Sequence, residues 1–173
     1  MNEKTKKYNP LRLAVAFVAS LMLPVAILTL TERNPFATAV ACILIPLGAY
    51  TVFAALARRS GRMVWWGFIF IFFSAFQIVL SYLFGNSVIA TDMFLNLMTT
   101  NPGEATELLS NIYPSVIAVC VVYIPLLWTA AVHINKKVEL PSSVRRTMFA
   151  WGGTTFLAGC AVLIFGCRGE VRH

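Results

Sequence analysis

Charged residues are scarce in this chain, where Asp, Glu, Lys and Arg together make up only 12% of 173 residues. Hydrophobic residues make up 58%, and the mean hydropathy of +0.75 lies far outside the range of soluble domains. No charged residue falls in the middle of a long apolar run, so the usual mark of an ion or proton pathway is missing. The composition excludes a soluble domain and argues against a transporter or pump.

The familiar catalytic and metal-binding motifs are missing as well. The four cysteines show no C-x-x-C spacing, and neither histidine has a catalytic partner nearby in the sequence. No Ser/His/Asp constellation, phosphate-binding glycine loop or set of metal ligands is evident. Cys42, Cys120 and Cys160 read as small apolar fillers, whereas Cys167 follows the last apolar run. We therefore expect no nucleophile and no cofactor in this chain.

Long apolar runs dominate what is present. Five of them are long enough for a helix of about 20 residues to cross the roughly 30 Å hydrocarbon core of a bilayer. They cover 11–30, 36–57, 63–84, 114–133 and 147–166. The first run is too long for the core of a signal peptide, and no cleavage site follows it directly, so we read it as a retained anchor. The sequence predicts an all-α membrane protein, with one transmembrane domain of five transmembrane helices over residues 1–173.

Eleven of the fourteen basic residues gather at three places in the sequence. These are the N-terminus with Lys4, Lys6, Lys7 and Arg12, the turn with Arg58, Arg59 and Arg62, and the loop with Lys136, Lys137, Arg145 and Arg146. Because cytoplasmic loops collect lysine and arginine, we expect these segments in the cytoplasm and, after five crossings, the C-terminus on the outer side. This asymmetry also explains the net charge of +7, so no nucleic-acid partner is expected.

Weaker patterns concern helix packing. Thr155 with Gly159, and Ala16 with Ser20, are pairs of small residues four apart that let membrane helices approach closely. Gln77 lies on one face of the phenylalanine-rich third run, where we expect it to form a hydrogen bond between helices.

The one substantial polar insertion, residues 85–113, separates the third and fourth runs on the outer side. Asn101 precedes Pro102, and proline fits the first position of a helix while it pushes the preceding residue out of the helical region. The insertion is therefore expected to form two short interfacial helices, over 91–100 and 102–111. The first carries an apolar stripe and is expected to lie on the bilayer surface.

Asn96, Thr100 and Glu104 are spaced by four in this insertion, which would stack them on one helical face. Such a face could hold a polar ligand at the membrane surface. Two structural alternatives stay open from spacing alone. With Asn101 as N-cap, Glu104 is the third helical residue and can close a capping box, and the other two residues can belong to a solvated polar face.

The insertion resembles the membrane domain of the lipid A phosphoethanolamine transferases, the polymyxin-resistance enzymes of Gram-negative inner membranes. The resemblance rests on the string Asn96-x3-Thr100-Asn101-Pro102-x-Glu104-Ala105-x-Glu107-Leu108-Leu109. In that family a large periplasmic domain with a threonine nucleophile and zinc follows the membrane domain. It takes phosphoethanolamine from phosphatidylethanolamine and passes it to lipid A or a related glycolipid. None of that domain is in this sequence.

The resemblance implies that this chain is the membrane-anchoring and donor-lipid-binding part of such a transferase, with Asn96, Thr100 and Glu104 matching the donor-headgroup residues. It also implies an inner-membrane location, zinc in the periplasmic domain that this chain lacks, and no transfer by this chain alone. A different class of function remains as an alternative. The chain would then be a complete, non-enzymatic membrane module that binds phospholipid or scaffolds a partner.

Overall fold

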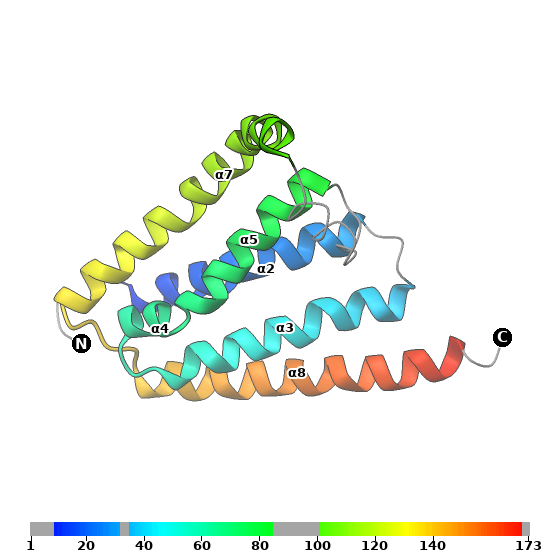
Figure 1. Ribbon diagram of the computed structural model, residues 1–173. Coiled ribbons are helices and arrows are strands. Elements are labelled where there is room, and N and C mark those ends of the chain that lie inside the picture. The colour runs from blue at the N-terminus through cyan, green and yellow to red at the C-terminus, as the bar shows by residue number, and fades with distance from the viewer. Residues whose placement is uncertain (1–8, 32–34, 85–100, 171–173) are drawn as a thin grey trace.

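The computed structural model describes residues 9–31, 35–84 and 101–170, and this part of the chain is helical apart from short connections. This part contains six helices, which converge at one side of Figure 1 and spread apart toward the other. They are α2 (Pro10–Thr31), α3 (Phe36–Leu56), α4 (Ser60–Trp66), α5 (Phe68–Phe84), α7 (Pro102–Asn135) and α8 (Ser142–Glu170). The predicted all-α class is confirmed.

Within the described residues, four helices are each long and apolar enough to cross a membrane, and they agree closely with four of the five predicted spans. These are Pro10–Leu30, Phe36–Leu56, Ile112–Asn135 and Ser142–Gly166. The third predicted span, 63–84, is not one straight helix, because α4 and α5 meet at an angle of 57°. Helix α5 has 17 residues, or about 25 Å, and is too short to cross about 30 Å alone. A fifth crossing therefore requires α4 and α5 together.

The break between α4 and α5 falls at Gly67, which packs against helix α2. A Cβ atom at this position would lie 2.4 Å from the ring of Phe17. The glycine thus makes room for a large, fully buried aromatic side chain. The close packing of α2 at this bend therefore depends on the absence of a side chain at Gly67.

Helix α2 lies at the centre of the bundle and contacts α3, α4, α5 and α7. Its buried Phe17 and Leu21 pack in one apolar cluster with Met63 and Val64 of α4 and Ile71 of α5. Many other large apolar side chains point outward, including five phenylalanines of α5. An exposed apolar surface around a small buried core is what a bilayer solvent permits.

Helices α3 and α8 form an antiparallel pair along one side of the bundle (Figure 1). Gly48 of α3 faces Gly152 of α8 so closely that a Cβ atom on Gly48 would lie 2.5 Å from the Phe156 backbone nitrogen. A Cβ atom on Gly159 would meet Leu44 and Ile45 of α3 in the same way. Close approach at Gly159 was predicted. Its pairing with α3 could not be read from α8 alone.

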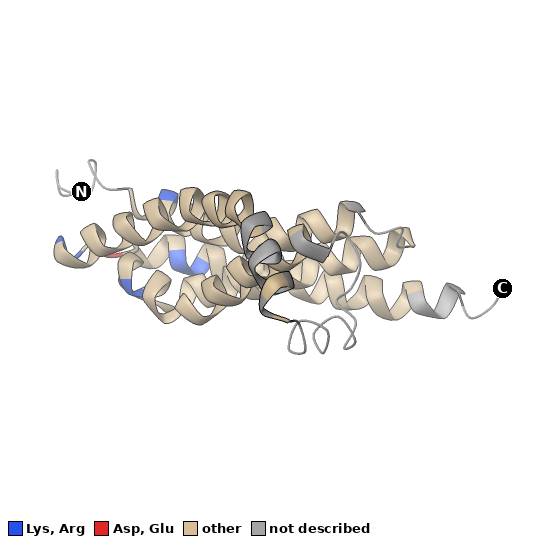
Figure 2. Cartoon of the chain, turned by 45° about the horizontal axis from the view of Figure 1, so that its top comes forward, with Lys and Arg blue, Asp and Glu red and all other residues tan. Residues whose placement is uncertain are grey.

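The lysines and arginines whose side chains the structure describes gather at one end of the bundle, as Figure 2 shows. Here the α3–α4 connection and the α7–α8 connection pair through an isolated antiparallel bridge between Arg59 and Glu139. The α7–α8 turn is closed by backbone bonds from Lys137 to Ile134 and from Val138 to His133, each 3.0 Å long. We call this end, defined by the two connections, the basic end.

The expected second short helix, 102–111, is helical but not separate. Helix α7 continues without interruption from Pro102 through Pro114 to Asn135. In Figure 1 the first turns of α7 are seen nearly end-on while the rest runs across the view, so the helix bends. Pro114 removes a backbone hydrogen bond and accounts for a bend without a break. The expected first helix, 91–100, lies outside the described residues.

Candidate functional site

The start of helix α7 is the described part of the site expected in the polar insertion. Asn101 is its N-cap, and the Asn101 Oδ1 atom accepts a hydrogen bond of 2.9 Å from the Gly103 nitrogen. Pro102 follows as the first helical residue, as predicted. Glu104 then falls in the first turn, but its side chain is not described. Asn96 and Thr100 lie outside the described residues, so their position relative to Glu104 stays a prediction.

The position of this helix start along the membrane axis follows from the sequence of α7. The apolar span begins at Ile112, eight residues after Glu104, which is about 12 Å along a helix axis. The first turns of α7 bend away from the direction of the rest of the helix (Figure 1). The N-cap therefore lies at the end of the bundle remote from the basic end.

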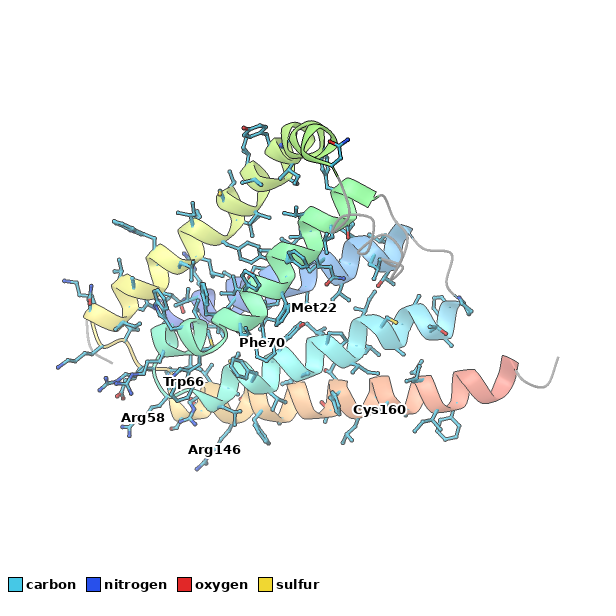
Figure 3. The ribbon with its side chains drawn as sticks, viewed as in Figure 1. Met22, Arg58, Trp66, Phe70, Arg146 and Cys160 are labelled. Atoms are coloured by element: carbon cyan, nitrogen blue, oxygen red, sulfur yellow. The ribbon has the colours of Figure 1, made fainter. Side chains whose placement is uncertain are left out.

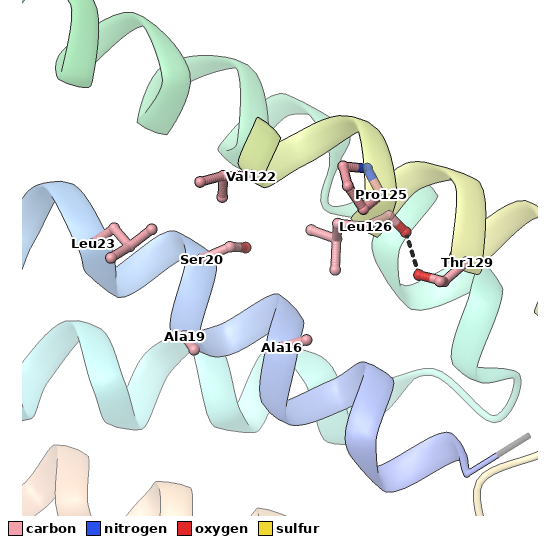
Figure 4. Close-up of a pocket in the computed structure, with 8 residues that line it drawn as sticks. All are labelled: Ala16, Ala19, Ser20, Leu23, Val122, Pro125, Leu126 and Thr129. Atoms are coloured by element: carbon pink, nitrogen blue, oxygen red, sulfur yellow. Dashed lines mark hydrogen bonds between the residues drawn. The ribbon is translucent and has the colours of Figure 1, made fainter. Parts of the chain in front are cut away.

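An apolar groove of about 420 Å³ runs between α2 and α7 (Figure 4). Its walls are formed by small and aliphatic side chains, among them Ala16, Ala19 and Leu23 of α2 and Val122 of α7. Thr129 also lines it, yet its hydroxyl donates to the Leu126 carbonyl 2.9 Å away. The lining thus offers a ligand almost only van der Waals contact, which suits a hydrocarbon chain.

A second groove of about 440 Å³ lies where α2, α3 and α8 meet. Met22 of α2, Leu47 of α3 and Met148 of α8 contribute to its walls. Thr51 also lines it, and its hydroxyl donates to the Leu47 carbonyl at 2.7 Å. Both grooves therefore have apolar walls in which the hydroxyls bond to their own helices.

A buried polar contact joins α2 to α7 and α5 in the middle of the bundle. The Tyr123 hydroxyl donates to the Ser20 carbonyl at 3.1 Å, and the Ser74 hydroxyl donates to the Leu21 carbonyl at 3.5 Å. The sequence offered a signal for this contact, since Tyr123 is a hydroxyl-bearing residue in mid-span. Its partner is a backbone carbonyl, which no side-chain pattern reveals.

At the basic end, sequence reasoning missed a second buried contact. Ser60 Oγ lies 2.9 Å from His133 Nδ1 and 3.2 Å from the Val138 carbonyl oxygen. Ser60 and His133 are 1% and 7% exposed, so a substrate cannot reach them. The pair resembles part of a hydrolytic site in composition, but its burial and its bond to the backbone give it a structural role, joining the start of α4 to the end of α7.

The described residues contain no group of three or more His, Cys, Asp or Glu side chains that could hold a metal ion. What they do contain is an anchored bundle with apolar grooves and, at the end remote from the basic residues, a capped helix start that carries Glu104.

Comparison with known proteins agrees with this arrangement. Residues 47–167 match the phosphoethanolamine transferase EptA/EptB family, over the part that forms its N-terminal membrane domain. That match takes in α4, α5 and the bent helix α7, together with the second half of α3 and most of α8. No curated protein and no solved structure matches the chain. The chain belongs to the family of N-terminal membrane domains of phosphoethanolamine transferases.

Proposed function

We propose that this chain anchors a phosphoethanolamine transferase in the bacterial inner membrane and holds its donor lipid, phosphatidylethanolamine. The family match over residues 47–167, which includes the polar insertion and the start of α7, is the observation that carries this proposal. The family is the membrane domain of a larger transferase. The acceptor is lipid A or a related glycolipid, and the transfer itself, with its zinc, belongs to the family's periplasmic domain.

The donor headgroup is held by Asn96, Thr100 and Glu104. A phosphatidylethanolamine headgroup presents an ammonium group, which a carboxylate pairs, and phosphate oxygens, which amide and hydroxyl groups bind. The capped helix start supports this assignment because it puts Glu104 in the first turn of α7, about 12 Å along the helix axis from the start of the apolar span. Asn101 caps the helix through its bond to Gly103, and the role that we assign to Glu104 is to pair the ammonium group of the headgroup.

The apolar grooves support the lipid part of the proposal. Each has a volume of several hundred Å³, and its walls are mainly aliphatic side chains of the membrane-spanning helices. The groove between α2 and α7 begins at Val122, about 15 Å along α7 from the start of its apolar span at Ile112, so an acyl chain of a phospholipid held at the start of α7 would reach only the nearer end of this groove (Figure 4). The grooves would hold such a chain by burial of apolar surface.

The topology follows the basic residues. The basic end lies in the cytoplasm, and five crossings, with α4 and α5 as the third, bring the insertion and the end of α8 to the periplasmic side. The donor headgroup would then be held on the side where the family's catalytic domain works.

The experiment that tests this proposal measures binding of phosphatidylethanolamine to the purified chain in a neutral-lipid background. Glu104→Gln retains a side chain that can close a capping box but loses the charge that pairs the ammonium. We expect its affinity to fall about tenfold or more, since a charge-assisted contact contributes about 1.5 to 3 kcal/mol. Asn96→Ala and Thr100→Ala should weaken binding as well.

Glu107→Gln is the matched control, because it removes the same charge from the next turn of the same helix and should leave the affinity unchanged. Thermal stability is recorded for every variant. Unchanged affinity in all three site variants would contradict the headgroup site. Equal losses of affinity in Glu104→Gln and Glu107→Gln would mean that the overall negative charge of this helix start attracts the headgroup and that Glu104 has no specific role.

A further inference from the structure

A polar pocket of about 370 Å³ lies at the basic end, between the α3–α4 and α7–α8 connections. It is lined by Arg58 from the first connection, by Glu139, Leu140 and Pro141 from the second, and by Ser142 and Arg145 from the start of α8. This pocket is at the opposite end of α7 from the proposed donor site. It belongs neither to the grooves nor to the headgroup site described above.

The walls of this pocket are held in place by bonds between the two connections. The Leu140 nitrogen donates to the Arg58 carbonyl at 2.9 Å, and the Ser60 nitrogen donates to the Val138 carbonyl at 3.2 Å. The buried Ser60–His133 contact joins the start of α4 to the end of α7 and so also holds the two connections together. The pocket is therefore a built feature of the fold, although it lies between loops.

The two arginines of the pocket differ in what they already bind. Arg145 donates from Nε to the Ala55 carbonyl at 3.0 Å and from Nη2 to the Leu56 carbonyl at 3.3 Å, which closes the end of α3. Arg58 has a side chain 75% exposed and meets Glu139 at 3.5 Å. Exposed ion pairs of this kind contribute little free energy. The Arg58 guanidinium can therefore exchange its partner for a phosphate group.

The surroundings of the pocket indicate where such a phosphate would come from. Phe149 lies one turn after Arg145 on α8 and is 53% exposed, and Trp151 is 69% exposed. Leu56, at the end of α3, and Trp66, at the end of α4, are exposed as well, and Figure 3 labels Trp66 near Arg58. Exposed aromatic and aliphatic side chains beside basic residues mark the level where acyl chains give way to headgroups. A phospholipid lying along Phe149 would bring its phosphate to Arg145 and Arg58.

We propose that this pocket binds the phosphate of an anionic phospholipid in the leaflet at the basic end. The lining carries one more positive than negative charge, and Arg59, Arg62 and Arg146 add to the positive field nearby. A headgroup with a net negative charge is favoured in this field, whereas a zwitterionic headgroup gains less. The chain would then recognise two lipid classes, with the zwitterionic donor at one end and an anionic lipid at the other.

The test is a native mass spectrometry titration of the purified chain with phosphatidylglycerol, with phosphatidylcholine as the neutral reference. Phosphatidylglycerol should bind more tightly. Arg58→Gln should weaken its binding about fivefold, whereas Arg62→Gln, which removes the same charge outside the pocket, should change it by less than about twofold. Glu139→Gln should tighten binding, because it removes the carboxylate that competes for Arg58. Unfolding cannot produce that tightening.

Three results would overturn the proposal. Equal losses in Arg58→Gln and Arg62→Gln would mean diffuse attraction without a pocket. Equal binding of phosphatidylglycerol and phosphatidylcholine would exclude a site that selects anionic phospholipids. Displacement of the lipid by inorganic phosphate at the same concentration would show an anion pocket that does not select a phospholipid.

Discussion

Two parts of this bundle are held together in different ways. The α3–α8 pair is joined by backbone-to-backbone approach at Gly48, Gly152 and Gly159. The group of α2, α4, α5 and α7 is joined by large buried side chains, such as Phe17 and Met63, and by hydrogen bonds that cross between helices. Helix α2 connects the two parts through its contact with α3.

The difference shows two solutions to one problem. In lipid, apolar side chains gain little by leaving the solvent, so helices associate through close packing or through interhelical hydrogen bonds. The α3–α8 pair uses close packing along a long contact between the two helices. The group around α2 uses both, and its polar contacts fix the relative positions of segments as far apart in sequence as Ser20 and Tyr123.

The largest effect is expected from Gly48→Ala in the glycine contact. The new methyl group would lie 2.5 Å from the Phe156 nitrogen and 2.7 Å from the Gly152 carbonyl oxygen. Because both are backbone atoms, the helices must move apart. We expect a loss of about 3 kcal/mol in the free energy of unfolding, measured in detergent micelles. Gly152→Ala, with contacts of 2.9 Å to Val52 atoms, should act in the same direction.

Gly153→Ala is the matched control, because a Cβ atom there meets nothing within 4 Å. It should be neutral, or stabilising by up to about 1 kcal/mol, since alanine favours a helix over glycine. If Gly48→Ala and Gly153→Ala behaved alike, close approach would not hold α3 to α8.

A smaller effect is expected from Ser60→Ala at the basic end. The change removes the hydroxyl shared by His133 and the Val138 carbonyl and should cost about 2 kcal/mol, the usual range for a buried hydrogen-bonding group. Ser143→Ala, an exposed position at the start of α8, is the control and should cost almost nothing. If Ser60→Ala lost no more stability than Ser143→Ala, the two connections would be held by their backbone bonds alone.

The smallest effect is expected from Tyr123→Phe, which removes the hydroxyl bond to the Ser20 carbonyl and keeps the ring. Interhelical hydrogen bonds in membrane proteins average about 0.6 kcal/mol, and we expect a loss of that size. Tyr113→Phe on the same helix is the reference, because Tyr113 is exposed. A larger loss of stability for Tyr123→Phe than for Ser60→Ala would contradict the expected order of the two polar contacts.

Much of this fold could be predicted because bilayer thickness fixes the length of an apolar run. Four predicted spans match described helices to within a few residues at most ends. The Asn101–Pro102 helix start is confirmed because N-cap and first-turn preferences are local. The family was recognised from the string that begins at Asn96, and the match over residues 47–167 confirms it.

The rest depended on contacts between distant segments. The bend at Gly67 packs against the ring of Phe17, fifty residues earlier in the chain. The spacing of apolar residues does not predict such a contact. The Ser60–His133 contact has no local pattern either. Pro114 would ordinarily mark a helix boundary, yet α7 continues through it with a bend. For the site itself, Asn96 and Thr100 lie outside the described residues, so their role remains a prediction.

The central claim is that the chain crosses the membrane an odd number of times, with the basic end in the cytoplasm and the proposed donor site on the other side. Labelling of Cys167, just after the last span, tests this directly in a variant with alanine at Cys42, Cys120 and Cys160. Intact cells are treated with a thiol reagent that crosses the outer but not the inner membrane, under conditions that reduce disulfides. The account predicts labelling of Cys167 in intact cells. Labelling only after the inner membrane is lysed would contradict it.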